Sequence, residues 1–335
     1  VVSVFSGWAR LNAGDVDGVE PGLVAAEGLL GSPHDSEPGE ELDALPVTIA
    51  LYRAAVAQAR GDLPGVARHA RRALELTAAG DHLGRGAAAG MLGLASWASG
   101  DLEAGVGAFT EARASLLLAG NVTDALSTTM VVGDMLTVLG RLREAEALYR
   151  DALRRVGDSA PAADLHAGLA DLLVARNQLA QARQHLESSE ALHDSASSRE
   201  HRYRWFVAMS RLAQAEDHPD EALSLLDSAH QLYLRGFFPE SQPIDALRAR
   251  IWITQGRLAE ARAWAAQHQL TQADELSYLR EFAHLTLARL MIAEHADPTA
   301  LLDRLLIAAD AAARTGSVIE ILMLQALAIP TSGSQ

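Results

Sequence analysis

A motif of about forty residues recurs along this chain and constrains its fold more than any other feature. Clear copies are GDLPGVARHARRALEL from Gly61, GDLEAGVGAFTEARASL from Gly100, GRLREAEALYRDALRRV from Gly140 and GRLAEARAWAAQHQL from Gly256. Aligned two residues after the turn position, the copies have anchors at Val16, Leu63, Leu102, Leu142, Leu179, Pro219, Leu258 and Pro298. Successive anchors lie 47, 39, 40, 37, 40, 39 and 40 residues apart. A fixed period of this length is the signature of a repeat protein.

Each copy predicts a helix with a small residue one turn before a bulky one. The position three past the anchor holds Val19, Val66, Gly105, Ala145, Ala182, Ala222, Ala261 or Leu301. The position seven past it holds Leu23, Ala70, Phe109, Tyr149, Leu186, Leu226, Ala265 or Leu305. Neighbouring small and bulky side chains on one helix face let a partner helix pack closely.

An apolar helical pattern also precedes each turn, as in LHAGLADLLVARNQ before Leu179. Gly100, Gly140 and Gly256 fall where a left-handed residue would end that first helix. The sequence therefore predicts an all-α fold, a right-handed superhelix of about eight TPR-like helical hairpins (an α-solenoid) forming one domain over residues 1–335. An unrelated all-helical bundle is the alternative.

The stretch GRGAAAG, from Gly84, resembles a glycine-rich phosphate loop. A phosphate loop follows a strand, however, and the preceding residues HARRALELTAAG have a helical pattern. The chain also has no lysine that could reach a phosphate. We therefore interpret Gly86, Gly90 and Gly93 as packing glycines, whose missing side chains let adjacent helices approach.

The charge and residue usage exclude several classes of protein. The 28 basic residues are all arginine and are outnumbered by 43 acidic residues, a net charge of −15 that disfavours direct nucleic-acid binding. The absence of cysteine is compatible with a reducing cytoplasm. No apolar run is long enough to span a membrane. The chain does not begin with methionine, and we expect it to be part of a longer protein.

No catalytic or metal-binding motif stands out. The twelve histidines form no HxxxH or HxxEH pair, and there is no GxSxG sequence. Most acidic residues lie in segments such as REAEALYRD, where pairing with arginine on an exposed helix face is the simpler interpretation. We expect no enzymatic activity, although an unrecognised helical active site is an alternative.

Several strings resemble the helical-repeat domain of MalT-like, large ATP-dependent LuxR-type transcriptional regulators. The resemblance runs from about Val4 to Ala328. The strings that carry it are LPVTIALYRAAVAQARGDLPGVARHARRALEL, DHLGRGAAAGMLGLASWASGDLEA, HRYRWFVAMSRLAQAE, RGFFPESQPIDALRARIWITQGRLAEARAW, ELSYLREFAHLTLARLMIA and ARTGSVIEILMLQALA.

The resemblance implies a sensor domain that recognises a small inducer, a sugar in the namesake, and acts with an ATPase and a helix-turn-helix domain. Neither of those domains is in this chain, so we expect no cofactor here and ATP on the absent ATPase domain. The implied partners are a sugar or other polar metabolite, the other domains of the parent regulator, and a second copy or a repressor protein. The resemblance implies a cytoplasmic location.

The repeat register also predicts which residues the first helices present to a concave groove. The inward row holds Ala55, Leu94, Asp134, Asp171, Arg211, Arg250 and Leu290, and the neighbouring rows add Trp97, Met130, Asp164, Val207, Arg204, Gln214 and Thr286, with Tyr203, Trp205 and Tyr278 nearby. Seven of them form the predicted ligand-binding set: Trp97, Met130, Asp134, Asp171, Arg204, Arg211 and Arg250. Acids, arginines and flat aromatic surfaces suit a polar ligand. The competing interpretation is that the acids and arginines only pair with one another between repeats.

Two functions therefore remain open. The first is an effector-sensing domain that binds a small molecule in the groove and relays the signal to domains outside this chain. The second is a TPR scaffold that binds a peptide or protein partner in the same groove. The change from aspartate to arginine along the inward row favours a local pocket over a repeated peptide clamp.

Overall fold

The structure, a computed structural model, describes residues 7, 9–11, 15–30, 44–157, 159–192, 199–233 and 239–329. Every element in these ranges is helical, as predicted. The chain divides into two compact units, residues 1–128 (unit 1) and 129–335 (unit 2). The prediction of a single domain over 1–335 stays a prediction, and the two units are described separately.

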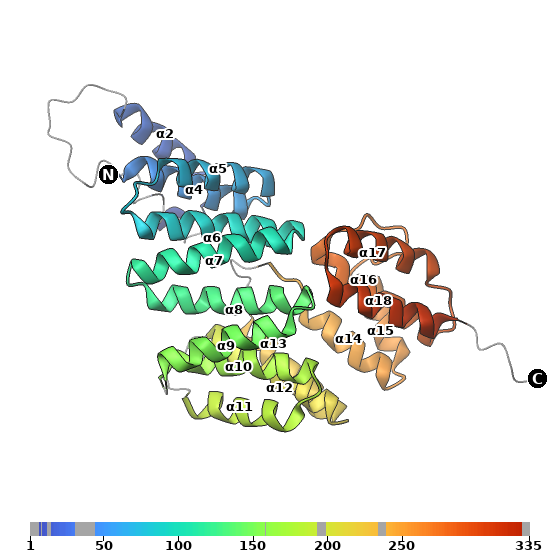
Figure 1. Ribbon diagram of the computed structural model, residues 1–335. Helices are drawn as coiled ribbons and strands as arrows, with labels where there is room; N and C mark the ends of the chain where they lie inside the picture. Colours follow the sequence, from blue (N-terminus) through green and yellow to red (C-terminus); the bar gives the residue numbers. More distant parts are fainter. Residues whose placement is uncertain are drawn as a thin grey trace, which may run out of the picture. The chain divides into compact units, whose positions relative to one another are not determined.

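In its described residues, unit 1 contains five complete helices and the first part of a sixth (Figure 1). Its helices are α2 (Val19–Leu30), α4 (Leu45–Ala59), α5 (Leu63–Leu76), α6 (His82–Ser99), α7 (Leu102–Leu118) and the first part of α8 (Val122–Val138). The helices α4 and α5 pack together as one hairpin, and α6 and α7 as the next. Within this unit the first helices α4 and α6 also contact each other.

Unit 2 continues the same arrangement (Figure 1). After the last part of α8 come α9 (Leu142–Val156), α10 (Ala162–Ala175), α11 (Leu179–Leu192), α12 (Arg199–Ala215), α13 (Pro219–Leu232), α14 (Ile244–Thr254), α15 (Leu258–Gln267), α16 (Tyr278–Ala293), α17 (Thr299–Ala311) and α18 (Thr315–Ala328). The first helices of successive hairpins lie in contact, α10 with α12, α14 with α16 and α16 with α18. Their side chains therefore share one face of the unit.

The repeat register is confirmed by the helix boundaries. The second helix of a hairpin begins at the predicted anchor in six copies: Leu63, Leu102, Leu142, Leu179, Pro219 and Leu258. All sixteen side chains predicted three and seven residues past the anchors are buried. These paired buried positions make a continuous core inside each stack of hairpins, which is how repeat proteins obtain their stability.

The turns between paired helices have the predicted left-handed backbone. Gly100, Gly140 and Gly256 have φ of +84°, +75° and +72°. Asn177 and Asp217 take this conformation at the corresponding turns, with φ of +55° and +63°. Asparagine and aspartate are the non-glycine residues that tolerate this region best, so these repeats keep the turn without glycine.

The GRGAAAG stretch is part of helix α6 and contributes to helix packing. A Cβ atom on Gly93 would lie 2.6 Å from the buried Phe109 ring, and one on Gly86 would lie 2.9 Å from Leu116. Both glycines therefore permit the close contact of α6 with α7, as predicted. The prediction is wrong for Gly90, because nothing lies within 4 Å of a Cβ atom there.

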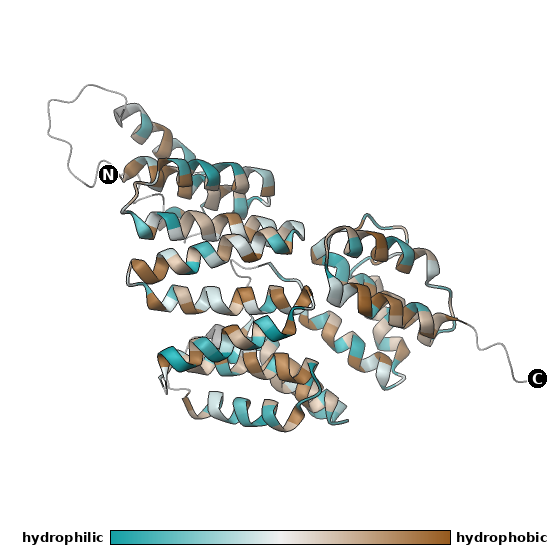
Figure 2. Cartoon of the chain, in the orientation of Figure 1, coloured by the Kyte–Doolittle hydropathy of each residue, from teal (hydrophilic) through white to brown (hydrophobic). Residues whose placement is uncertain are grey.

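The last helix, α18, buries one face and exposes another. Ile321 and Leu324 are buried in the core of unit 2, whereas Ile319, Leu322, Met323 and Leu327 are between 50% and 66% exposed. Figure 2 shows the apolar character of this helix. No helix in the described part of the chain is long and apolar enough to cross a membrane.

Candidate functional site

Five of the seven predicted ligand-binding residues share one face of unit 2. These five residues are Asp134 on α8, Asp171 on α10, Arg204 and Arg211 on α12, and Arg250 on α14. Their side chains are only partly exposed, between 17% for Arg250 and 39% for Asp134. We call these residues, with the neighbours described below, the polar cluster.

The first part of the polar cluster joins helices two repeats apart. Arg204 Nη1 donates to Asp134 Oδ2 at 3.0 Å. The buried Tyr149 hydroxyl donates to the backbone carbonyl of Met130 at 3.3 Å and also lies 3.5 Å from Asp134 Oδ1. Asp134 is thus held between a cation and a phenol, in a position set by the small residue Gly133 beside it on α8.

The second part is centred on Arg211. Its guanidinium forms an ion pair with Asp171 and donates a hydrogen bond to the side-chain oxygen of Gln242. Gln242 lies immediately before α14, so Arg211 connects three consecutive hairpins. The other carboxylate oxygen of Asp171, Oδ1, is buried and has no hydrogen-bond partner among the described residues.

The third part surrounds Arg250. Its Nε donates to the Thr286 hydroxyl at 3.0 Å, and its guanidinium carbon lies 3.7 Å from the centre of the Phe282 ring. Its Nη2 lies 2.9 Å from Glu320 Oε1. Arg289 donates to the same oxygen, at 3.0 Å from Nη2. One carboxylate oxygen on α18 therefore serves two arginines, from α14 and α16.

The three parts act on one another electrostatically. Burial raises the pKa of Asp134, with Asp171 adding to the effect and Arg204 opposing it. Burial lowers the pKa of Arg250 to about 10, with Arg289 and Arg211 acting in the same direction and Glu320 opposing them. Burial works against charge on Arg204, but Asp134 keeps the pKa of that guanidinium above its ordinary value. The polar cluster is thus one coupled set of charges.

Trp97 and Met130 do not offer a ligand surface, contrary to the prediction. Trp97 is 5% exposed and belongs to the core of unit 1, whereas the other predicted residues belong to unit 2. Met130 is 3% exposed, and its Cε would lie 2.6 Å from a Cβ atom on Gly168. Both residues lie on first helices, as the register predicts, but their side chains are buried.

The nearby aromatic residues also serve mainly in packing. Trp205 donates its ring N–H to the Leu186 carbonyl at 3.0 Å and meets Phe206 edge-on, as expected for a core residue. Tyr203 packs against Tyr233 with ring centres 5.6 Å apart. Phe282, which was not predicted, contacts the polar cluster through the guanidinium of Arg250.

Four residues of the polar cluster were missed from the sequence: Gln242, Phe282, Arg289 and Glu320. Phe282 and Arg289 flank the predicted Thr286 on α16, four residues before and three after it. They could have been found by extending the inward row by one helical turn in both directions. Glu320 carried no such signal, because α18 has no second helix in this sequence to set its register.

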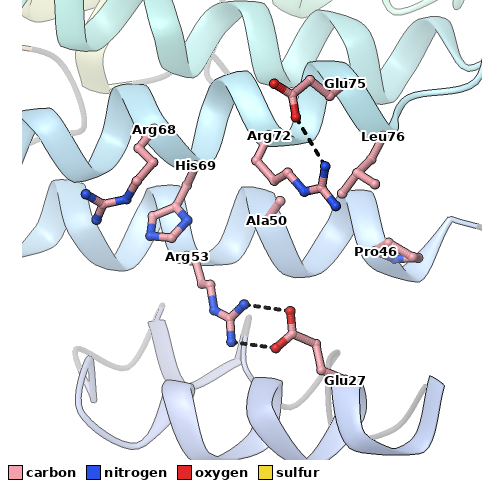
Figure 3. A pocket seen from close by; sticks show the side chains of 9 residues that line it. All are labelled: Glu27, Pro46, Ala50, Arg53, Arg68, His69, Arg72, Glu75 and Leu76. Carbon is pink, nitrogen blue, oxygen red and sulfur yellow. Dashed lines mark hydrogen bonds and ion pairs between the residues drawn. The ribbon is translucent and has the colours of Figure 1, made fainter. Parts of the chain in front are cut away.

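A separate pocket of about 500 Å³ lies in unit 1 between α2, α4 and α5 (Figure 3). Its cations are largely neutralised. Arg53 binds Glu27 at 2.7 Å and also Glu20, and Arg72 binds Glu75 at 3.1 Å. The pocket contains none of the predicted ligand-binding residues, and Arg68 and His69 complete its basic lining.

The polar cluster is built from ion pairs and hydrogen bonds between side chains of different helices. Its carboxylates are paired with arginines, and its hydroxyl and amide groups are already engaged in hydrogen bonds. In the described part of the chain, no group of three or more histidine, cysteine, aspartate or glutamate side chains could hold a metal ion. Such an arrangement can exchange internal ion pairs for contacts with a polar ligand.

The stacked helical hairpins define a TPR-like helical-repeat protein. Residues 48–335 match the model of the MalT-like TPR region, and the chain belongs to that family. Among the curated proteins, none matches the chain.

Solved structures of similar fold include several bacterial regulators. A Rap protein complexed with competence and sporulation factor has 13% identity and a TM-score of 0.53, covering 97% of this chain and 96% of its own. The Rap conjugation gene regulator of plasmid pLS20, in complex with the Phr* peptide, has 14% identity and a TM-score of 0.55, covering 96% and 87%. The apo quorum sensor NprR from B. thuringiensis has 11% identity and a TM-score of 0.53, covering 97% and 86%. At these identities the likeness concerns the fold alone.

Proposed function

We propose that this chain is the effector-sensing domain of a MalT-like, ATP-dependent LuxR-type transcriptional regulator. The effector is a small polar molecule that binds at the polar cluster of unit 2. Binding alters the packing of the hairpins, and the change passes to ATPase and DNA-binding domains outside this chain. The domain itself is not an enzyme, holds no cofactor and acts in the cytoplasm.

The observation that carries this proposal is the arrangement around Arg211. Three consecutive hairpins supply Asp171, Arg211 and Gln242, and Asp171 keeps one buried oxygen without a hydrogen-bond partner among the described residues. A buried acceptor without a donor costs about 1–3 kcal/mol. A ligand hydroxyl that donates to Asp171 would recover this free energy, and its own oxygen could accept from Arg211.

Ligand binding here would also be felt by more than one repeat. Each hairpin of a solenoid contacts mainly its neighbours, so a change in one interface biases the next. A ligand that replaces the contact between Arg211 and Gln242 loosens the link from α12 to the start of α14. The ligand therefore binds more tightly to the conformation in which Arg211 has released Gln242. This difference in affinity supplies the free energy that shifts the population towards that conformation.

The alternative is a scaffold that binds a peptide or a protein partner. It is favoured by the similar fold of the Rap regulator whose structure holds the Phr* peptide. A peptide clamp would use the same polar residues in consecutive repeats. The polar cluster instead changes from Asp171 to Arg211 to Arg250 at the equivalent positions of α10, α12 and α14, which favours one local site.

A thermal-shift screen of the purified chain tests the proposal. The small-molecule arm contains sugars, sugar phosphates, organic acids and amino acids, and a separate arm contains a peptide pool. A ligand at 100 times its dissociation constant adds about 2.7 kcal/mol to stability, a visible shift. Stabilisation by a small molecule supports the sensor, and stabilisation by peptides alone supports the scaffold.

Two variants then locate the site. Arg211→Ala should abolish binding of the small molecule while leaving the helical circular dichroism spectrum unchanged. Arg155→Ala is the matched control, since Arg155 is 70% exposed and pairs only within α9. Undiminished binding by Arg211→Ala would remove the polar cluster as the site.

A further inference from the structure

The contacts of Glu320 differ from those of the other carboxylates in the polar cluster. Asp134 pairs with Arg204 and Asp171 with Arg211, one cation for each acid. In Glu320, the same carboxylate oxygen, Oε1, contacts both Arg250, at 2.9 Å, and Arg289, at 3.0 Å. This corner of the polar cluster therefore has two guanidinium groups for one carboxylate.

The excess positive charge is felt by Arg250. Burial, Arg289 and Arg211 together lower its pKa to about 10, and the single carboxylate of Glu320 does not offset them. Nη2 of Arg250 is buried and, despite its short distance to Glu320, makes no well-aligned hydrogen bond among the described residues. A second anionic group at this place could accept a hydrogen bond from Arg250 Nη2, which has no well-aligned acceptor now.

The surroundings orient Arg250 for such a group. Phe282 covers one face of its guanidinium at 3.7 Å, and Thr286 accepts from Nε. With Nε and one face of the guanidinium occupied, the edge that carries the Nη atoms is the part of Arg250 that faces the Glu320 carboxylate. Arg289 is 35% exposed, so the second arginine can be reached from solvent. Two arginine forks beside an aromatic face are a geometry that carboxylates bind well.

Glu320 is held by a helix with a firm anchor at its first turn. Arg314 and Ser317 both donate to the buried carboxylate of Glu281, at 2.6 Å in each case. A Cβ atom on Gly316 would lie 2.7 Å from the carbonyl oxygen of Val138, so this turn packs closely on the end of α8. Releasing Glu320 would therefore remove the polar link from the middle of α18 to α14 and α16, while the first turn and the buried Ile321 and Leu324 keep the helix in place.

We propose that Arg250 and Arg289 form a subsite for a carboxylate group of the effector, and that Glu320 is the internal carboxylate which this group displaces. The inference rests on the proposed function, because it gives the chemical class of the ligand at the same site. It also assigns the relay: an anionic ligand breaks the ion pairs that link Glu320 of α18 to α14 and α16, and a neutral one does not.

Isothermal titration calorimetry with succinate and citrate tests the subsite without knowledge of the natural effector. Glu320→Gln removes the internal competitor but keeps a side chain of the same size, and it should bind both probes at least tenfold more tightly than the wild type. Adding Arg289→Gln to that variant should cancel the gain. Glu294→Gln is the matched control, because Glu294 pairs with the single arginine Arg262 elsewhere in unit 2, and it should leave binding unchanged.

Inorganic phosphate and glucose complete the panel. Glucose should not respond to Glu320→Gln, and phosphate should gain less than citrate, since the site is formed around a planar carboxylate. Amide hydrogen exchange in α18 should rise around residue 320 when citrate binds the wild type. Equal binding by Glu320→Gln and Glu294→Gln, or a gain that survives Arg289→Gln, would overturn the subsite.

The outcome is separable from that of the proposed function. Asp171→Asn should weaken binding of an effector found in the screen, whereas Arg289→Gln should weaken binding of succinate. If an effector from the screen binds the Arg289→Gln variant as tightly as the wild type, the proposed sensor function stands and the carboxylate subsite is refuted. A citrate response without any effector in the screen would support the subsite and count against the sensor.

Discussion

Two glycines three residues apart in α6 give a direct test of how the hairpins pack. A Cβ atom on Gly93 would lie between 2.6 and 2.9 Å from three atoms of the Phe109 ring, whereas one on Gly90 would meet nothing within 4 Å. Phe109 is 4% exposed, so its ring has little room to move. Gly93→Ala should therefore destabilise unit 1, and Gly90→Ala should stabilise it.

The magnitude follows from the difference between the two variants. Both gain about 1 kcal/mol from replacing glycine with alanine inside a helix. Only Gly93→Ala has the cost of overpacking a core, about 1–3 kcal/mol. The helical gain is common to both and cancels, so Gly93→Ala should be less stable than Gly90→Ala by about 1–3 kcal/mol.

Urea unfolding followed by circular dichroism measures this difference, with amide hydrogen exchange in α6 and α7 as a local check. Exchange matters because a repeat protein can unfold in parts, and one global transition then underestimates a local effect. Phe109→Leu in the Gly93→Ala background removes the ring atoms that clash and should restore part of the lost stability. Equal stability of the two alanine variants would refute the assignment of Gly93 as a packing residue.

Two further predictions concern buried and titrating groups in unit 2. Arg314→Met breaks an ion pair with Glu281 whose side chains are 5% and 7% exposed. It should cost about 3–5 kcal/mol in thermal unfolding, against less than about 1 kcal/mol for the exposed Arg155→Met. Burial, followed by the neighbouring His166, lowers the pKa of His185 to about 4. Between pH 6.5 and 4 the unfolded chain binds more protons at this site, so stability should fall as the pH falls, and His185→Gln should flatten that slope.

The repeat pattern was sufficient to predict the helices because its cause is local. A left-handed turn, a small residue three past the anchor and a bulky one seven past it define each hairpin independently of the others. Ala182 and Leu186 show this in α11: both are buried, although Asn177 replaces the turn glycine. Gly90 was assigned wrongly because the glycine spacing alone does not say which side of α6 meets α7.

The polar cluster was only partly predictable, because its pairs depend on how the hairpins stack. Asp171 and Arg211 occupy equivalent positions in neighbouring repeats, so their contact follows from the register. Arg250 and Glu320 are 70 residues apart, and their contact needs the rotation that accumulates over several repeats. That rotation is a sum of small packing angles between neighbouring helices, and no local pattern in the sequence records it.

The same argument supports placing the proposed carboxylate subsite at this position in unit 2. The cores of the hairpins consist of apolar contacts that are similar in every repeat. They therefore offer a ligand no feature that distinguishes one repeat from another. Glu320 meets Arg250 and Arg289 only because α18 is carried back towards α14 and α16, and Gly316 fixes it against Val138. The contact between Glu320 and the two arginines depends on the packing angles of the helices from α14 to α18. A ligand that replaces it can therefore sense, and alter, the arrangement of the unit as a whole.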